Sequence, residues 1–144
     1  MLLELSDWLR HSARKRQWKP DFALGRRGED LAHRYLRQRG YVVVARNYRL
    51  AAGDAEADII AWQENTLVFI EVKSRQTDEF GAPERAVGPE KEVHLRRVAR
   101  EYTRKASISL ECIRFDLVTV VFSPVTPTLR NQPVIHLIPN AFSI

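Results

Sequence analysis

Cysteine is almost absent from this chain, and long apolar runs are absent altogether. Cys112 is the one cysteine among 144 residues. A single cysteine excludes a disulfide framework within the chain and a cysteine-rich zinc site, and it is typical of a reducing cytoplasm. No apolar stretch approaches the ~20 residues that a membrane-spanning helix needs. We therefore expect a cytoplasmic protein that does not enter the membrane.

Several catalytic and metal-binding patterns are also missing. The four histidines are scattered, and no two of them have the spacing of zinc ligands. The sequence shows neither a Ser-His-Asp order nor a glycine-rich phosphate-binding loop. It contains no internal repeat and no low-complexity stretch. Zinc chemistry and serine-hydrolase chemistry are therefore not expected. The histidines are His11, His33, His94 and His136.

Charge is present in quantity but is unevenly distributed. The chain holds 23 Lys and Arg against 18 Asp and Glu, for a formal net charge of +5. Residues 1–50 contain 12 basic and 5 acidic residues, whereas residues 51–144 contain 11 and 13. Since a basic excess favours contact with a polyanion, we expect the first third to make such a contact. The acidic residues of the remainder must then serve another purpose.

Residues 1–20 are predicted to form a basic amphipathic arm, and residues 21–144 a single domain. The apolar residues of the arm are interrupted by Glu4, Ser6 and Asp7, so they do not form the continuous core of a signal peptide. A solvated tail, a contact with phosphate and a contact with a membrane surface are the alternatives for this arm. Its basic residues nearest the domain are Arg14, Lys15, Arg16 and Lys19.

The hydropathy pattern predicts a helix, three strands, a second helix and one or two further strands. Helices are predicted over residues 24–38 and 88–105, and strands over residues 41–48, 57–62, 66–73, 112–122 and 134–138. Short turns between the first three strands predict antiparallel pairing, and the second helix permits a parallel crossover. We therefore expect an α/β (α+β) fold with a central mixed sheet of four to five strands flanked by helices.

The most apolar predicted strand is followed by a polar segment. The sequence TLVFIEVK at residues 66–73 is apolar on both faces until its end, which indicates a central strand covered on both sides. Residues 74–86 are polar and contain Gly81 and Pro83, so we expect a mobile loop there.

Acidic side chains are predicted to gather where two strands meet. Glu56 and Asp58 stand two residues apart, as do Glu71 and Lys73, so each pair projects from one face of its strand. A hairpin turn at residues 64–65 would set residue 58 roughly opposite residue 71 or 72. Asp58 and Glu71 would then share a cation, and their hard oxygen ligands favour Mg²⁺ or Mn²⁺. Lys73 beside them can orient or deprotonate a water, or neutralise charge on a phosphate.

The same acidic pattern has an ordinary alternative. Glu71 can form a surface ion pair with Lys73 or with an arginine, and such a pair needs no metal. The triplet Glu-x-Lys is weak when taken alone. Its position at the end of the most apolar strand, with Asp58 across a plausible hairpin, is what singles it out.

Two helical residues border the apolar faces of the predicted helices. Glu29 can reach toward the sheet and supply a further carboxylate, although an acidic residue near a helix start is also favoured by the helix dipole alone. Lys91 lies on the apolar side of the second helix. It can direct its ammonium group at the acidic cluster, or it can simply extend past the edge of the core.

Other residues admit ordinary explanations. Trp8, Trp18 and Trp62 can stack on nucleic-acid bases, but packing in the core or at its rim is the alternative. Cys112 precedes a predicted strand and is expected to be buried.

Several separated motifs resemble one family. The chain resembles the YraN family of small bacterial proteins in GRRGEDLAHRYLRQRGYVVVARNY at residues 25–48, AEADIIA at 55–61, TLVFIEVKSR at 66–75, Lys91, and RFDLVTV at 114–120. That family is similar to archaeal Holliday-junction resolvases and belongs to the restriction-endonuclease-like, or PD-(D/E)xK, nuclease fold. The resemblance covers roughly residues 24–121.

The resemblance implies a restriction-endonuclease-like domain and a metal-dependent endonuclease that hydrolyses phosphodiester bonds in DNA, including branched or nicked DNA. Asp58, Glu71 and Lys73 fall on the nuclease signature. Glu29 falls on the acidic residue of the first helix, and Glu56 falls on the carboxylate that precedes the signature aspartate. All five are therefore candidate catalytic residues.

Ligands and contacts follow from this hypothesis. Asp58, Glu71 and the carbonyl group of Val72 would hold Mg²⁺ or Mn²⁺, and Lys73 would help to activate water. The expected partner is DNA, and a homodimer is open, because many junction enzymes need two sites. Salt-dependent contacts with phosphate are expected from basic residues. Those residues are Arg26, Arg27, Arg34, Arg75 and Lys91.

The chain departs from the family pattern at two positions. The family usually has glycine immediately before the residue that matches Glu56, and Ala55 stands here instead. If the backbone took a positive φ at that point, alanine would be strained by ~1 kcal/mol or more. Ala57 stands where the name of the motif places proline.

Two other function classes fit the same residues. A binding module with the nuclease fold but no turnover predicts salt-sensitive DNA binding, little metal affinity and no cleavage. A protein-interaction scaffold that docks through its basic arm predicts no DNA binding above the electrostatic background.

Overall fold

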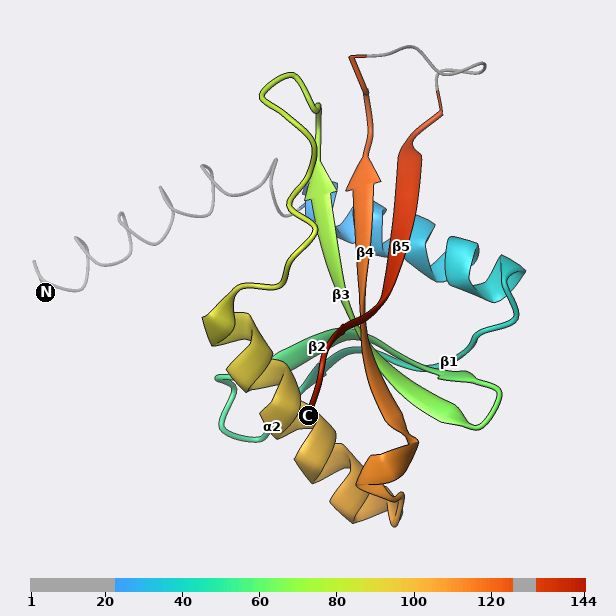
Figure 1. Ribbon diagram of the computed structural model, residues 1–144, viewed down its shortest axis with the longest axis vertical. Helices are drawn as coiled ribbons and strands as arrows, with labels where there is room; N and C mark the ends of the chain where they lie inside the picture. The colour runs from blue at the N-terminus through green and yellow to red at the C-terminus, as the bar shows by residue number, and fades with distance from the viewer. Residues whose placement is uncertain (1–22, 126–131) are drawn as a thin grey trace, which may run out of the picture.

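The computed structural model describes residues 23–125 and 132–144, so the predicted arm at residues 1–20 lies outside the described residues. Two helices flank a single five-stranded sheet (Figure 1). The first helix is described over residues 23–38. The remaining elements are β1 (Val42–Arg49), β2 (Glu56–Gln63), β3 (Thr66–Arg75), α2 (Pro89–Ala106), a short 3₁₀ turn (Leu110–Cys112), β4 (Ile113–Val121) and β5 (Val134–Phe142).

The sheet has the order β1-β2-β3-β4-β5 and mixes two kinds of pairing. β1–β2, β2–β3 and β4–β5 are antiparallel, whereas β3 and β4 run parallel because α2 carries the chain back between them. The α/β architecture with a mixed sheet, an antiparallel first half and a parallel crossover is therefore confirmed.

β3 is central and is covered on both faces, as its apolar sequence predicts. Residues 67–70 are fully buried. On one face, Phe69 packs with Leu95 and Val98 of α2. On the other face, Ile70 packs with Ala32 and other residues of the first helix. The two helices therefore lie on opposite faces of the sheet, and each approaches the strand that carries Glu71.

Several elements end elsewhere than the sequence predicted. β3 continues two residues further, to Arg75, and β5 continues to Phe142. The pairing of β5 with β4 shifts between Phe115 and Leu117, so Pro139 lies at an irregular point of an edge strand. Proline is tolerated there because no regular ladder bond is required of it.

Three predictions about single residues have clear outcomes. Cys112 is exposed, so the prediction that it is buried is wrong; it ends the 3₁₀ turn before the core strand begins. Trp62 is partly buried and packs against the core on the α2 face. Ala55 is buried and does not have a positive φ, so the predicted strain at this residue is absent. Gly53, with φ of 76°, has the left-handed conformation in that turn, which glycine adopts without strain.

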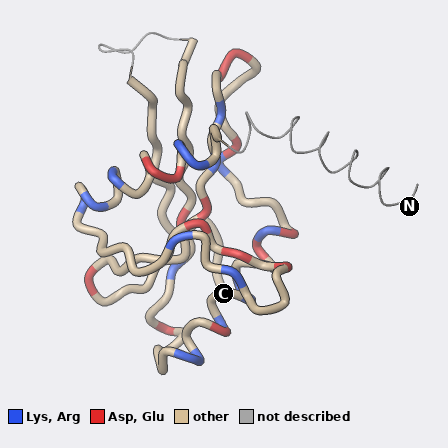
Figure 2. The backbone as a smooth tube through the Cα atoms, turned by 180° about the vertical axis from the view of Figure 1, so that it is seen from behind, with Lys and Arg blue, Asp and Glu red and all other residues tan. Residues whose placement is uncertain are grey.

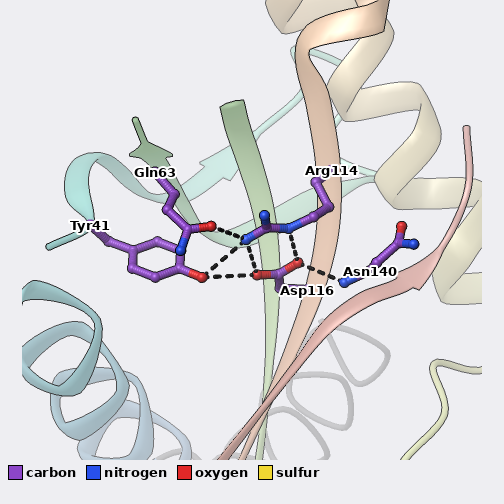
Figure 3. Close-up of polar contacts among 5 residues, drawn as sticks. All are labelled: Tyr41, Gln63, Arg114, Asp116 and Asn140. Atoms are coloured by element: carbon purple, nitrogen blue, oxygen red, sulfur yellow. Dashed lines mark hydrogen bonds and ion pairs between the residues drawn. The ribbon is translucent and has the colours of Figure 1, made fainter. Parts of the chain in front are cut away.

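A buried polar cluster joins four elements on the first-helix face of the sheet (Figure 3). The carboxylate of Asp116, which is 0% exposed, accepts bonds from Nε and Nη2 of Arg114 at 2.8 and 2.9 Å. It also accepts bonds from the hydroxyl group of Tyr41 at 3.3 Å and from the backbone N–H of Asn140 at 3.0 Å. Arg114 reaches further and donates to Oε1 of Gln63 at 2.6 Å. One carboxylate therefore organises the ends of β1, β2, β4 and β5.

The first helix approaches β3 through a glycine. A Cβ atom placed on Gly28 would lie 1.7 Å from Oγ and 2.9 Å from Cβ of Ser74. Neither distance is compatible with unshifted neighbours. The absence of a side chain at residue 28 therefore sets how closely the helix, and Glu29 with it, can approach the sheet.

We predict that Asp116→Ala lowers the free energy of unfolding by about 3–5 kcal/mol, because it leaves the Arg114 guanidinium and the Asn140 amide without their acceptor. Urea denaturation measures this. Asp54→Ala is the matched control, since Asp54 also binds an arginine, Arg97, through two contacts but on the surface. Equal losses in the two variants would contradict the structural role of the cluster.

We predict that Gly28→Ala destabilises the protein by about 1–3 kcal/mol, because the added methyl group overlaps Ser74. Gly25→Ala in the same helix is the control. No atom lies within 4 Å of the methyl group it would add, and alanine is the better helix former, so this variant should be as stable as the parent or more stable. Chemical denaturation of both variants tests the contact, and indistinguishable midpoints would refute it.

Candidate functional site

The β2–β3 hairpin brings two carboxylates together. Ile59 pairs with Ile70, which places Asp58 beside Glu71 one residue further along, as the hairpin register predicted. Asp58 is only 6% exposed, and the side chain of Glu71 is 14% exposed. The backbone N–H of Val72 donates to Oδ2 of Asp58 at 2.8 Å. Both acids are therefore held by the strands at the edge of the core.

Burial makes both carboxyl groups difficult to ionise. It raises the pKa of Glu71 to about 8, and the negative charge of Asp58 adds to the shift. Burial also raises the pKa of Asp58, against the opposing effects of the Val72 amide and the Lys91 ammonium. The two groups interact directly, so without a further cation the pair retains a proton at neutral pH.

A cation of α2 contacts this pair. Nζ of Lys91 lies 3.4 Å from Oε2 of Glu71. That oxygen is buried and accepts no hydrogen bond. A proton shared with Asp58 or a further cation can compensate such an oxygen, and a divalent cation with its bound waters is one that two adjacent carboxylates can hold.

Lys73 is directed at a loop rather than at the carboxylates. Its Nζ donates to the carbonyl oxygen of Ala86 and lies 3.5 Å from Oε2 of Glu84. Both partners belong to residues 76–88, which connect β3 to α2. The structure thus brings Lys91, and not Lys73, into contact with Glu71. The alternation of side chains along the strand places Lys73 on the same face as Glu71. It does not predict which group the long lysine side chain contacts.

The two other acidic candidates lie around the pair. Burial raises the pKa of Glu29, and the negative charge of Asp58 is the next cause, so the two carboxyl groups lie within electrostatic range of each other. Nη2 of Arg46 lies 3.6 Å from Glu29 and partly balances it. Oε2 of Glu56 forms an ion pair with Nε of Arg49 at 2.8 Å. Both residues have arginine partners, and Glu56 is more exposed than the pair, so Asp58 and Glu71 are the central acids.

No set of three or more His, Cys, Asp or Glu side chains in residues 23–125 and 132–144 is arranged as a complete metal site. Val72 contacts Asp58 through its amide, and its carbonyl as a ligand stays a prediction. A pair of carboxylates is nevertheless enough for Mg²⁺, which commonly takes one or two and fills its other positions with water and phosphate oxygens. Magnesium or manganese therefore also stays a prediction.

The basic candidates are distributed over the surface. The guanidinium of Arg27 stacks over the ring of Phe122 at 4.7 Å, and the carbonyl of Arg75 accepts a bond from the Phe122 amide. Arg34 lines a hollow of about 460 Å³ on the first helix, and Arg26 is exposed. Basic and acidic segments are scattered over the backbone (Figure 2). Their binding to phosphate stays a prediction.

Two residues near the site were not singled out from the sequence. Arg49 and His94 line a second hollow, of about 280 Å³, together with Lys91. His94 follows Lys91 by three residues, so the two share a helix face, and that spacing was the available signal. No sequence signal identified Arg49, because the turn at residues 50–55 is what brings it to the hollow.

We predict that, with EDTA present, the protein loses stability between about pH 5 and pH 8. The folded state keeps the Glu71 proton up to about pH 8, whereas the unfolded chain releases it near 4.5, so rising pH favours unfolding. Glu71→Gln removes this titration. Its stability relative to the parent should rise by a few kcal/mol across that range in urea melts. Parallel pH profiles for the two proteins would show that Glu71 titrates normally.

Comparison with known proteins places the chain in a family. No helix in the part of the chain that the structure describes is long and apolar enough to cross a membrane. The uncharacterised protein family UPF0102 matches residues 28–120. A UPF0102 protein of Solibacter usitatus is 50% identical over 109 residues, covering 74% of this chain and 83% of the relative. One from Koribacter versatilis is 44% identical over 118 residues, with 82% and 78% covered, and one from Dictyoglomus turgidum is 35% identical over 119 residues, with 83% and 96% covered. The chain belongs to the UPF0102 family, which is the YraN-type family that its motifs indicated.

Proposed function

We propose that this protein is a metal-dependent nuclease that hydrolyses phosphodiester bonds in DNA. One observation carries the proposal: Asp58 and Glu71 are held in contact at the edge of the core, and the buried Oε2 of Glu71 accepts no hydrogen bond. Such an arrangement is costly for a protein unless a cation or a proton compensates it. The nuclease signature in the resemblance falls on the same two residues.

The residues fit a hard divalent cation. Asp58 and Glu71 would hold Mg²⁺ or Mn²⁺, with the carbonyl group of Val72 as a further ligand. When bound, the ion would supply a more acidic water and charge stabilisation for the phosphate. Only two carboxylates are central, so we expect weak binding of the ion that strengthens when phosphate oxygens complete its shell.

The side chains of the protein would assist in distinct ways. The Lys91 ammonium, 3.4 Å from Glu71, is placed to neutralise negative charge that develops on a phosphate at this site. Glu29, on the first helix, lies within electrostatic range of Asp58 and would orient a water. Lys73 would activate water once its ammonium leaves Ala86 and Glu84, and its place in the nuclease signature supports that role.

DNA is the proposed substrate, and branched or nicked DNA is the proposed form. The first helix carries Arg26, Arg27 and Arg34 on its exposed side, and β3 ends at Arg75. Contacts between these arginines and phosphate would make the affinity for DNA fall as the salt concentration rises. The described residues form one small domain. Within this domain, substrate choice would depend on the shape of the DNA. A second copy of the chain would supply the second cut at a junction.

We predict that the full chain, with Mg²⁺ or Mn²⁺, cleaves single-stranded, nicked or four-way-junction DNA. Asp58→Asn and Glu71→Gln keep the shape of each side chain but remove its charge, and each should lower the cleavage rate by about 100-fold or more. Glu64→Gln, in the exposed hairpin turn, is the matched control and should cleave like the parent. In calorimetric titrations, Asp58→Asn and Glu71→Gln should also weaken the binding of Mn²⁺, whereas Glu64→Gln should leave it unchanged.

Two outcomes would contradict this proposal. Cleavage that persists unaltered in Asp58→Ala and Lys73→Ala proteins would come from another site or a contaminant. Salt-sensitive DNA binding by the parent, with no cleavage and no heat of Mn²⁺ binding, would instead identify a binding module that has the nuclease fold without turnover.

A further inference from the structure

A second hollow opens directly beside the two carboxylates. It measures about 280 Å³ and is lined by Arg49, Asp54, Glu56, Lys91 and His94. Three separate segments build it: the end of β1, the turn leading into β2, and the first turns of α2. It is thus a composite of the fold rather than a surface feature of one helix.

The hollow shares Lys91 with the proposed catalytic centre, whose two central carboxylates lie outside its lining. Lys91 lines the hollow, and its Nζ lies 3.4 Å from Oε2 of Glu71. Glu56 also lines it, and the charge of Glu56 acts on Asp58. A chain of phosphates with one member at the carboxylates would therefore have another member at or near the hollow.

The hollow offers nitrogen donors to an anion. Its two carboxylates are each paired with an arginine: Glu56 pairs with Arg49 at 2.8 Å, and Asp54 pairs at 2.8 Å with Arg97, which lies outside the lining. Lys91 is paired with Glu71, but an ammonium group has three N–H donors, so it can contact a ligand in the hollow at the same time. The imidazole of His94 also lines the hollow.

Arg49 can also turn toward a ligand at small cost. Its side chain is 66% exposed, and exposed ion pairs such as Arg49–Glu56 contribute little to stability. A guanidinium group binds phosphate through two parallel hydrogen bonds, which is a better arrangement than the single Nε contact it makes here. Because the contact with Glu56 uses only Nε, the two Nη groups can bind a phosphate while the Arg49–Glu56 pair persists.

We propose that this hollow is a phosphate subsite that holds the nucleic-acid strand next to the bond being cut, with Arg49, Lys91 and His94 as its contacts. The inference rests on the proposed function for the identity of the strand, but the binding itself does not require cleavage. The larger hollow on the first helix, lined by Asp30, His33, Arg34 and Arg37, is the natural rival because it is also cationic.

Each hollow contains one histidine, so the binding site can be identified directly. We suggest titrating the full chain, in EDTA and at fixed pH, with thymidine 3′,5′-bisphosphate while recording the imidazole ¹H–¹³C resonances. The resonances of His94 should shift saturably, and those of His33 and His136 should stay in place. His136, on β5, also reports that the protein remains folded.

Substitutions then test the contacts. Arg49→Met and His94→Gln should each weaken binding of the bisphosphate by about 5-fold or more, whereas Arg37→Met, in the rival hollow, should leave it unchanged. Inorganic phosphate at equal concentration should bind more weakly, because the two phosphates of the bisphosphate can contact Arg49 and Lys91 separately. Unmoved His33 and His136 resonances in the variants exclude misfolding as the cause of the loss.

Three results would overturn the subsite: no saturable shift at His94, a shift at His33 alone, or equal binding of inorganic phosphate and the bisphosphate. The cleavage experiment is independent of these. Bisphosphate binding without any nuclease activity would refute the proposed function and keep the subsite. Nuclease activity without a shift of the His94 resonances would support the proposed function and refute the subsite.

Discussion

The pairing of β2 with β3 holds together two carboxylates that would separate in water, and the site depends on this constraint. Ladder hydrogen bonds and the buried residues around Ile59 and Ile70 fix the register, so Asp58 and Glu71 have no freedom to move apart. Their mutual repulsion, added to burial, is what makes a proton or a cation necessary. A sheet core that is stable for hydrophobic reasons thus maintains an electrostatically unfavourable arrangement at its edge.

The two helices complete this arrangement from opposite faces of the sheet. The first helix brings Glu29 toward Asp58, and its close approach relies on the missing side chain of Gly28. α2 brings Lys91 to Glu71 and, one turn later, His94 to the neighbouring hollow. Because the crossover between β3 and β4 requires a helix at this place, the parallel half of the sheet explains why a cation reaches the acidic pair.

Much of this could be predicted from sequence because it follows from short-range periodicity. Alternation along residues 56–58 and 71–73, together with a tight turn between the strands, was sufficient to place Asp58 opposite Glu71. Contacts that depend on loops could not be predicted in this way. The carbonyl of Ala86 that holds Lys73, and the turn that brings Arg49 beside His94, are fixed by tertiary packing. The extension of β5 past Pro139 likewise depends on its irregular pairing with β4.

Neighbouring positions of the sheet have different roles: Asp116 stabilises the fold, and the acids on the other face form the candidate site. Asp116 pairs across the ladder with Ile70, one residue from Glu71, yet it projects to the other face, where every partner it needs is present. Asp116 accepts hydrogen bonds at both of its oxygens and links the strands around it, while on the other face the buried Oε2 of Glu71 accepts none. Substitutions at Asp58 and Glu71 can therefore arise without unfolding the sheet. A substitution that weakened the Asp116 cluster would lower stability and reduce the number of such changes that the protein tolerates.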